Sequence, residues 1–162
     1  MATTQRPLPK DQPKDIRGLY DTLKQIAAQH IAIADFGCGE SVNYTGSTRN
    51  YPLLYLELPF SITTAGDKGK GYLEHYDVTI AVADRTPSDT NELDLINALS
   101  RVKQLLVHVH TLLDAQVSCS PLGILTYQEI GNDRMVVARG QFTVTMHRAD
   151  APQDAAQSST TA

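Results

Sequence analysis

The chain has 162 residues, and its 14 Lys and Arg against 18 Asp and Glu give a formal net charge of −4 at pH 7. A chain of this length can form one domain with enough buried apolar surface to fold without a disulfide or a metal. Basic residues are scattered without a run, so the composition excludes a protein that binds nucleic acid mainly through positive charge.

Both ends of the chain have the composition of arms. Residues 1–14 contain several prolines and lack the apolar stretch of a signal peptide, and residues 149–162 are rich in Gln, Ser, Thr and Ala. We therefore expect a flexible N-terminal arm over 1–14, a single domain over 15–148 and a flexible C-terminal tail over 149–162.

Apolar runs and cysteines indicate the compartment. No apolar run approaches the ~18 residues of a membrane span, so no membrane association is expected. Cys38 and Cys119 lie far apart in loop-like contexts and form no disulfide framework. Assembly in the cytosol is the simpler interpretation, and a single bridge between the two cysteines stays open.

Periodicity in the first third predicts one helix and two strands. Apolar residues recur at helical spacing over 15–30, where Asp15 suits the positive end of the helix dipole. An extended segment interrupted by glycines follows from Ile31 and predicts a bent first strand. Apolar side chains on both faces predict a second strand from Tyr51 to Ser61, in a sheet covered on one side and touching a neighbour on the other.

Glycines and charges dominate the segment from Thr63 to Gly71, which is too polar to bury and too flexible for a two-residue turn. We expect a mobile hairpin loop there that serves as a contact loop. Its candidate contact residues are Thr63, Thr64, Gly66, Asp67, Lys68, Gly69, Lys70 and Gly71. A phosphate-binding loop is the weaker interpretation, because the pattern G-x-x-x-x-G-K-[ST] is absent and no helix follows directly.

The second half predicts a strand, a long helix and a hairpin. Alternation over 72–84 predicts a third strand whose largely apolar face meets the core. A wide apolar stripe then predicts a helix of about 24 residues, capped by Ser88 or Asp89 with Glu92 in capping-box position. Two last strands, over 124–130 and 136–146, are joined by a turn at Gly131-Asn132-Asp133.

The order of elements is therefore α-β-β-β-α-β-β. Strands joined by short hairpins and flanked by two helices predict an α+β domain with an antiparallel sheet of four to five strands.

No pattern predicts catalysis, a metal or a cofactor. His108 and His110 are two apart on a helix and point in different directions, so they cannot share a metal as an i, i+4 pair could. Cys38 has no base at a recognisable spacing. Asp84 beside Arg85 is explained by the turn before the long helix, with at most a local ion pair. We expect a protein that is not an enzyme.

Some surface is hard to explain in a monomer. The second strand is apolar on both faces, the first is broken by glycines and resembles an edge strand, and the arms add nothing to a core. These features suit a subunit of an assembly. The alternative is a monomer whose two helices cover both faces of the sheet.

The chain resembles the tail terminator or tail-completion (head–tail joining) proteins of tailed bacteriophages. The resemblance covers residues 15–148. It is carried by the order of elements, the segment Arg49-Asn50-Tyr51-Pro52-Leu53-Leu54-Tyr55, the strand Tyr76-Asp77-Val78-Thr79-Ile80-Ala81-Val82-Ala83-Asp84 and the long helix from Asp89.

The resemblance implies a homo-oligomer, a hexameric ring that caps the tail tube and joins it to the head-side connector or stopper protein. DNA would pass through the channel without specific binding, as suits an acidic chain. The implied location is the tail or neck of the virion, after assembly in the host cytoplasm, and the loop over 63–71 would reach a neighbouring subunit or ring. Two alternatives remain: a head–tail adaptor or stopper of the neck, and a small-ligand-binding module.

Overall fold

The computed structural model describes residues 13, 15–40, 49–58, 60–67, 71–87, 91–130 and 134–147. Apart from Pro13, the arms predicted at 1–14 and 149–162 lie outside the described residues. In chain order the elements are α1 (Ile16–Gln29), β1 (Asp35–Gly39), β2 (Leu53–Glu57), β3 (Ser61–Asp67), β4 (Gly71–Arg85), α2 (Glu92–Asp114), β5 (Ser118–Cys119), β6 (Gly123–Ile130) and β7 (Arg134–His147). The expected α+β class is confirmed.

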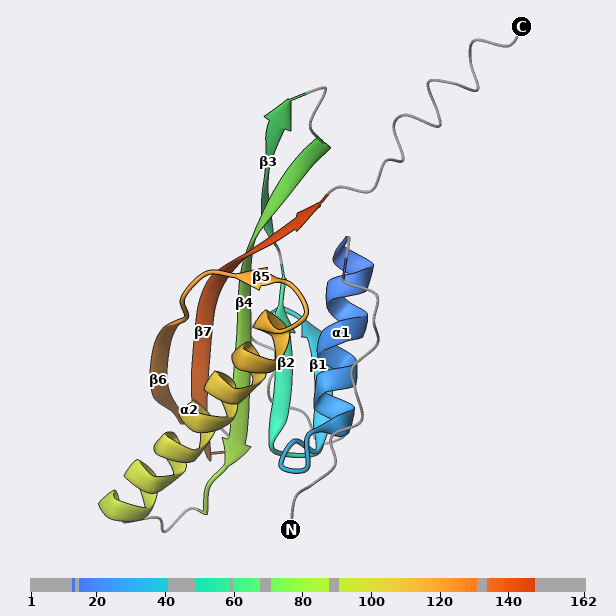
Figure 1. Cartoon of the computed structure of the whole chain (residues 1–162). Helices are drawn as coiled ribbons and strands as arrows, with labels where there is room; N and C mark the ends of the chain where they lie inside the picture. Colours follow the sequence, from blue (N-terminus) through green and yellow to red (C-terminus); the bar gives the residue numbers. More distant parts are fainter. Residues whose placement is uncertain are drawn as a thin grey trace, which may run out of the picture.

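Two long strands, β4 and β7, run antiparallel side by side through the middle of the sheet (Figure 1). The other edge of β4 pairs with β3 along its first half and with β2 along its second half. The other edge of β7 pairs with β6 over Arg134–Gln141 and then with β5. The strand order β1-β2-β4-β7-β5 therefore describes a sheet in which short strands line both sides of a long central pair.

The sheet is mixed, so the expectation of a wholly antiparallel sheet is wrong. β1 and β2 pair in parallel, with Asp35 opposite Leu53 and Gly39 opposite Glu57. A tight hairpin turn can join only antiparallel neighbours, whereas a parallel pair needs a crossover of about a dozen residues. The connection over 40–52 is long enough for such a crossover.

The described residues form a seven-stranded sheet, above the predicted four to five strands. The predicted second strand over 51–61 divides in two, because β2 ends at Glu57 and the chain resumes pairing with a different stretch of β4 at Ser61. The two-residue β5 is too short to produce any periodicity in the sequence. The turn predicted at 131–133 lies outside the described residues. The predicted hairpin is confirmed, because Ile130 at the end of β6 pairs with Arg134 at the start of β7.

Capping residues fix where both helices begin. Asp15, expected only to suit the positive end of the helix dipole, is the N-cap of α1, since its carboxylate accepts a hydrogen bond from the Gly18 N–H at 2.7 Å. Asn91 caps α2 by accepting from the Asp94 N–H at 2.9 Å. The predicted cap at 88 or 89 is therefore wrong, and those two residues lie outside the described chain.

Both helices cover the same face of the sheet (Figure 1). The apolar stripes of α1 and α2 share one core with the even-numbered residues of β4, namely Tyr76, Val78, Ile80 and Val82. The predicted core face of this strand is thus confirmed, and the alternative with helices on both faces is wrong.

A second apolar cluster lies on the opposite face of the sheet, which we call the helix-free face. It consists of Leu53, Tyr55, Ala81, Ala83, Met135 and Val137, all buried, with Tyr51 and Tyr127 packed against it. Glycines of β1 make room for it: a side chain at Gly37 would meet the Tyr55 ring and Arg49. The prediction that β2 buries apolar groups on both faces is confirmed.

Candidate assembly interface

Most of the predicted contact loop is β-strand, so the prediction of a loop conformation is wrong. Thr63, Thr64, Gly66 and Asp67 belong to β3, Gly71 begins β4, and Lys68, Gly69 and Lys70 lie outside the described residues. Pairing runs from Ser61 opposite Asp77 to Asp67 opposite Gly71. The sequence did not reveal this strand because the side chains of residues 61–66 are exposed on both of its faces, so no apolar alternation marks it.

This hairpin extends beyond the two-layer body and away from the helices (Figure 1). Residues 61–66 are all exposed. The end of β7 continues alongside it, with Leu73 opposite His147, and the His75 Nδ1 lies 2.9 Å from the Thr145 hydroxyl. We call the unit formed by β3, the first half of β4 and the last third of β7 the β extension. Its surface presents polar side chains and backbone groups, which suit contact with another protein through hydrogen bonds.

A charged pair crosses the helix-free face. Arg139 of β7 contacts the carboxylate of Glu57 on β2 through Nε at 3.0 and 2.9 Å and through Nη2 at 2.6 Å. On the strand between them, the residue opposite Arg139 is the small Ala81, and Glu57 lies two residues beyond the β2 partner of Ala81, so the long arginine side chain reaches it diagonally. Glu57 is only 5% exposed, and its hydrogen bond raises the pKa of Arg139. The pair lies 82 residues apart, so no local spacing could have predicted it.

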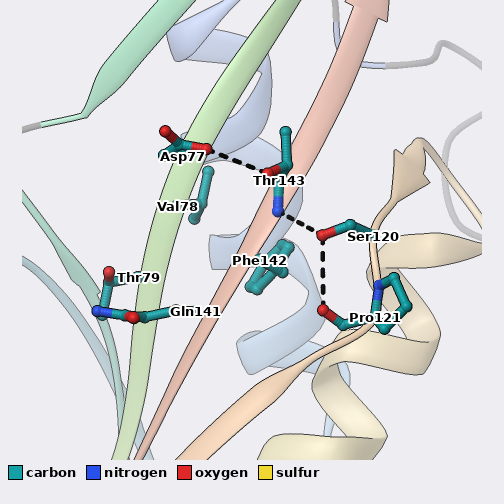
Figure 2. A pocket seen from close by; sticks show the side chains of 8 residues that line it. All are labelled: Asp77, Val78, Thr79, Ser120, Pro121, Gln141, Phe142 and Thr143. Carbon is teal, nitrogen blue, oxygen red and sulfur yellow. Dashed lines mark hydrogen bonds between the residues drawn. The ribbon is translucent and has the colours of Figure 1, made fainter.

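An open polar cleft of about 450 Å³ lies beside the β extension, where β7 changes partner from β6 to β5 (Figure 2). The Thr143 hydroxyl donates to Asp77 at 3.1 Å, and the Thr143 N–H donates to the Ser120 hydroxyl at 2.7 Å. His110 bonds the carbonyl of Ser120 at 2.9 Å and not its hydroxyl, so serine and imidazole do not form a nucleophile and base here. The cleft offers hydrogen bonds to a small polar molecule without catalytic geometry.

Two histidines that looked unrelated in the sequence meet between the helices. The Nε2 of His30 at the end of α1 lies 2.8 Å from the Nδ1 of His108 in α2. The Ala32 N–H donates to the Nδ1 of His30 at 3.1 Å, so the His30 proton is on Nε2 and is donated to His108. In the described part of the chain, no three His, Cys, Asp or Glu residues gather where a metal could bind.

Both cysteines are free thiols, so the single bridge that the sequence left open does not form. Burial raises the pKa of Cys38, and burial together with the nearby charge of Asp114 raises the pKa of Cys119 to about 12. Asp84 forms an ion pair with Arg101 of α2 at 2.9 Å and accepts a hydrogen bond from the Arg85 N–H at 2.9 Å. Its role is to tie the end of β4 to the long helix.

Within the described chain, neither helix combines the length and apolarity that crossing a membrane requires.

Comparison with known proteins gives likenesses among solved structures, and the one described below is distant. No protein-family model and no curated protein matches this chain. Among solved structures, a chain in the virion of a native gene transfer agent particle is 16% identical with a TM-score of 0.38, and the match covers 68% of this chain and 78% of that chain. A TM-score this low does not establish a shared fold.

Proposed function

We propose that this chain is a structural subunit of a phage-like virion, a tail terminator that forms a ring on the tail tube and joins it to the head-side connector. The observation that carries the proposal is the β extension, whose exposed β3 projects from a body with its own buried core. Because its residues 61–66 are all exposed, β3 adds little to the stability of its own subunit. It does offer main-chain and hydroxyl groups to a neighbouring ring.

The buried core suggests which part of the subunit forms the wall of the ring. The helix-covered face of the sheet is rigid, since its apolar residues are buried, and it forms this wall. The net charge of −4 suits a channel wall that lets DNA pass, because each phosphate neutralised by a basic side chain would add affinity. In this proposal the protein is not an enzyme and needs no cofactor.

A head–tail adaptor or stopper of the neck is the second candidate. It would use the same ring and β extension but would bind the portal side instead of the tube. The small-ligand module is the third candidate, and the polar cleft at Asp77 and Ser120 is the feature that favours it.

Native mass spectrometry of the chain with the tail tube protein from the same genome tests the proposal. We expect a ring that binds the tube, and a variant with Ile62→Glu and Thr64→Glu on β3 that keeps the ring and loses the tube. Gln29→Glu, an equally exposed position on α1, is the matched control and should bind as the wild type does.

Two results would contradict the proposal. Binding to the head-side connector without the tube would indicate the adaptor. A monomer that binds neither protein, together with a small molecule that binds at Asp77, would indicate the ligand module.

A further inference from the structure

In the part of the chain that the structure describes, the sheet ends on each side in a strand with one unpaired edge. Among the described residues, β1 pairs only with β2, and β6 pairs only with β7. Such edges expose rows of backbone N–H and C=O groups that can pair with a strand from another chain. Neither edge has a proline within its strand to block pairing.

The two edges occupy the same levels of the sheet. Following the pairing from strand to strand, one row contains Gly37, Tyr55, Ala81, Arg139 and Leu125. The next row joins Cys38 of β1 to Ile124 of β6 in the same way. A neighbouring copy placed at the same height therefore brings its β1 level with β6.

Strand direction is also compatible. β1 runs parallel to β2, and each of the three steps from β2 through β4 and β7 to β6 is antiparallel. β6 therefore runs opposite to β1. If the sheet continues from one copy into the next without inverting the subunit, the new pair is antiparallel, which is the geometry that tolerates one uncovered face.

Side chains at the two edges complement each other. β6 exposes two large apolar residues, Leu125 at 60% and Ile124 at 36%. Beside β1, a groove of about 280 Å³ lies between this strand and α1 and is lined mainly by apolar side chains, including Ala28, Ala34 and Phe36. Ile124 and Phe36 are on the helix-covered face of their strands, since each shares a row with core residues of that face.

We propose that β6 of one copy pairs antiparallel with β1 of the next copy, with Ile124 opposite Cys38 and beside Phe36, and with Thr126 opposite Phe36 at the groove between α1 and β1. It rests on the proposed function in one respect, namely that copies of this chain assemble with one another. The contact joins two different surfaces, so it is heterologous and closes into a ring when the rotation between copies is right. The occupant of the groove is a second copy of this chain.

Two variants that each block one surface test the inference. Ala34→Glu places a charge at the groove and leaves β6 intact, whereas Ile124→Glu places a charge on β6 and leaves the groove intact. Both positions are exposed, so both variants should fold, which circular dichroism melting checks. Should either unfold, Ala28→Glu and Thr126→Glu block the same two surfaces at other exposed positions.

We expect the wild type to form closed oligomers in native mass spectrometry, and each variant alone to be a monomer. An equal mixture should form heterodimers and stop there, because only the intact β6 of one variant and the intact groove of the other can meet. The double substitution on β3, Ile62→Glu with Thr64→Glu, is the control and should assemble as the wild type does.

Three results would overturn the inference: a wild type that stays monomeric at its highest soluble concentration, single variants that still form the wild-type oligomer, or a mixture without heterodimers. Failure of the proposed function has a different signature. An oligomer that depends on both edges but does not bind the tail tube protein would support the inference and contradict the terminator.

Discussion

Arg139 of β7 forms an ion pair with Glu57 of β2 across β4, the strand between them. The glutamate side chain is almost completely buried, while the arginine side chain is 35% exposed. The pair therefore lies at the boundary between the second apolar cluster and the solvent on the helix-free face.

Removing the arginine should be costly, because it leaves a buried carboxylate without its partner. A fully buried pair broken in this way costs roughly 3–5 kcal/mol. Since Arg139 is partly solvated, we expect Arg139→Met to lower the free energy of unfolding by about 2–3 kcal/mol in urea titrations. The double variant Glu57→Gln with Arg139→Met should recover part of this loss, and a double variant no more stable than the single one would contradict the explanation.

Glycine at position 140 allows the long helix to approach the sheet. A Cβ there would lie 2.6 Å from the Leu122 Cδ1 and 3.1 Å from the Leu106 Cδ2. We expect Gly140→Ala to destabilise the protein by about 1–2 kcal/mol through overpacking. Gly123→Ala is the matched control, because its Cβ would meet only the Gln141 carbonyl at an ordinary 3.7 Å. Equal melting temperatures of the two variants would refute the prediction.

The cap of α2 can be tested on its own. Asn91→Ala removes the acceptor for the Asp94 N–H and should lower the free energy of unfolding by about 1 kcal/mol. Asn91→Asp keeps an acceptor and adds a negative charge at the positive end of the helix dipole, so it should match or exceed the wild type. Chemical denaturation of the three proteins measures both effects.

The histidine pair predicts a dependence of stability on pH. Burial, and next the charge on His108, lower the pKa of His30 below its usual value of 6.5. Between the folded and unfolded pKa values the unfolded chain binds more protons, so this contribution is complete above pH 6.5 and is lost as pH falls below it.

Thermal melts across this pH window check the prediction. His30→Gln should flatten the decline in stability at acid pH, because no imidazole remains at position 30 to take up a proton on unfolding. Arg17→Gln on the exposed face of α1 is a control for changed net charge and should keep the wild-type slope. An unchanged slope in His30→Gln would show that other groups cause the decline.

Local patterns in the sequence were enough to predict most elements and the class. The stripe of α1 and the alternation of β4 each depend on residues within a few positions of one another. Their signals arise because one face of each element is buried. β3 escaped prediction for the opposite reason, since its residues 61–66 are exposed on both faces.

Other features depend on residues that are distant in the chain, and only the folded structure could reveal them. These are the parallel pairing of β1 with β2, the pair of Glu57 with Arg139, the contact of His30 with His108, and the common level of the β1 and β6 edges. Periodicity indicates which face of an element is buried, but it does not indicate which other element packs against that face. Strand order and register decide that, because they place side chains from distant segments in the same row of the sheet.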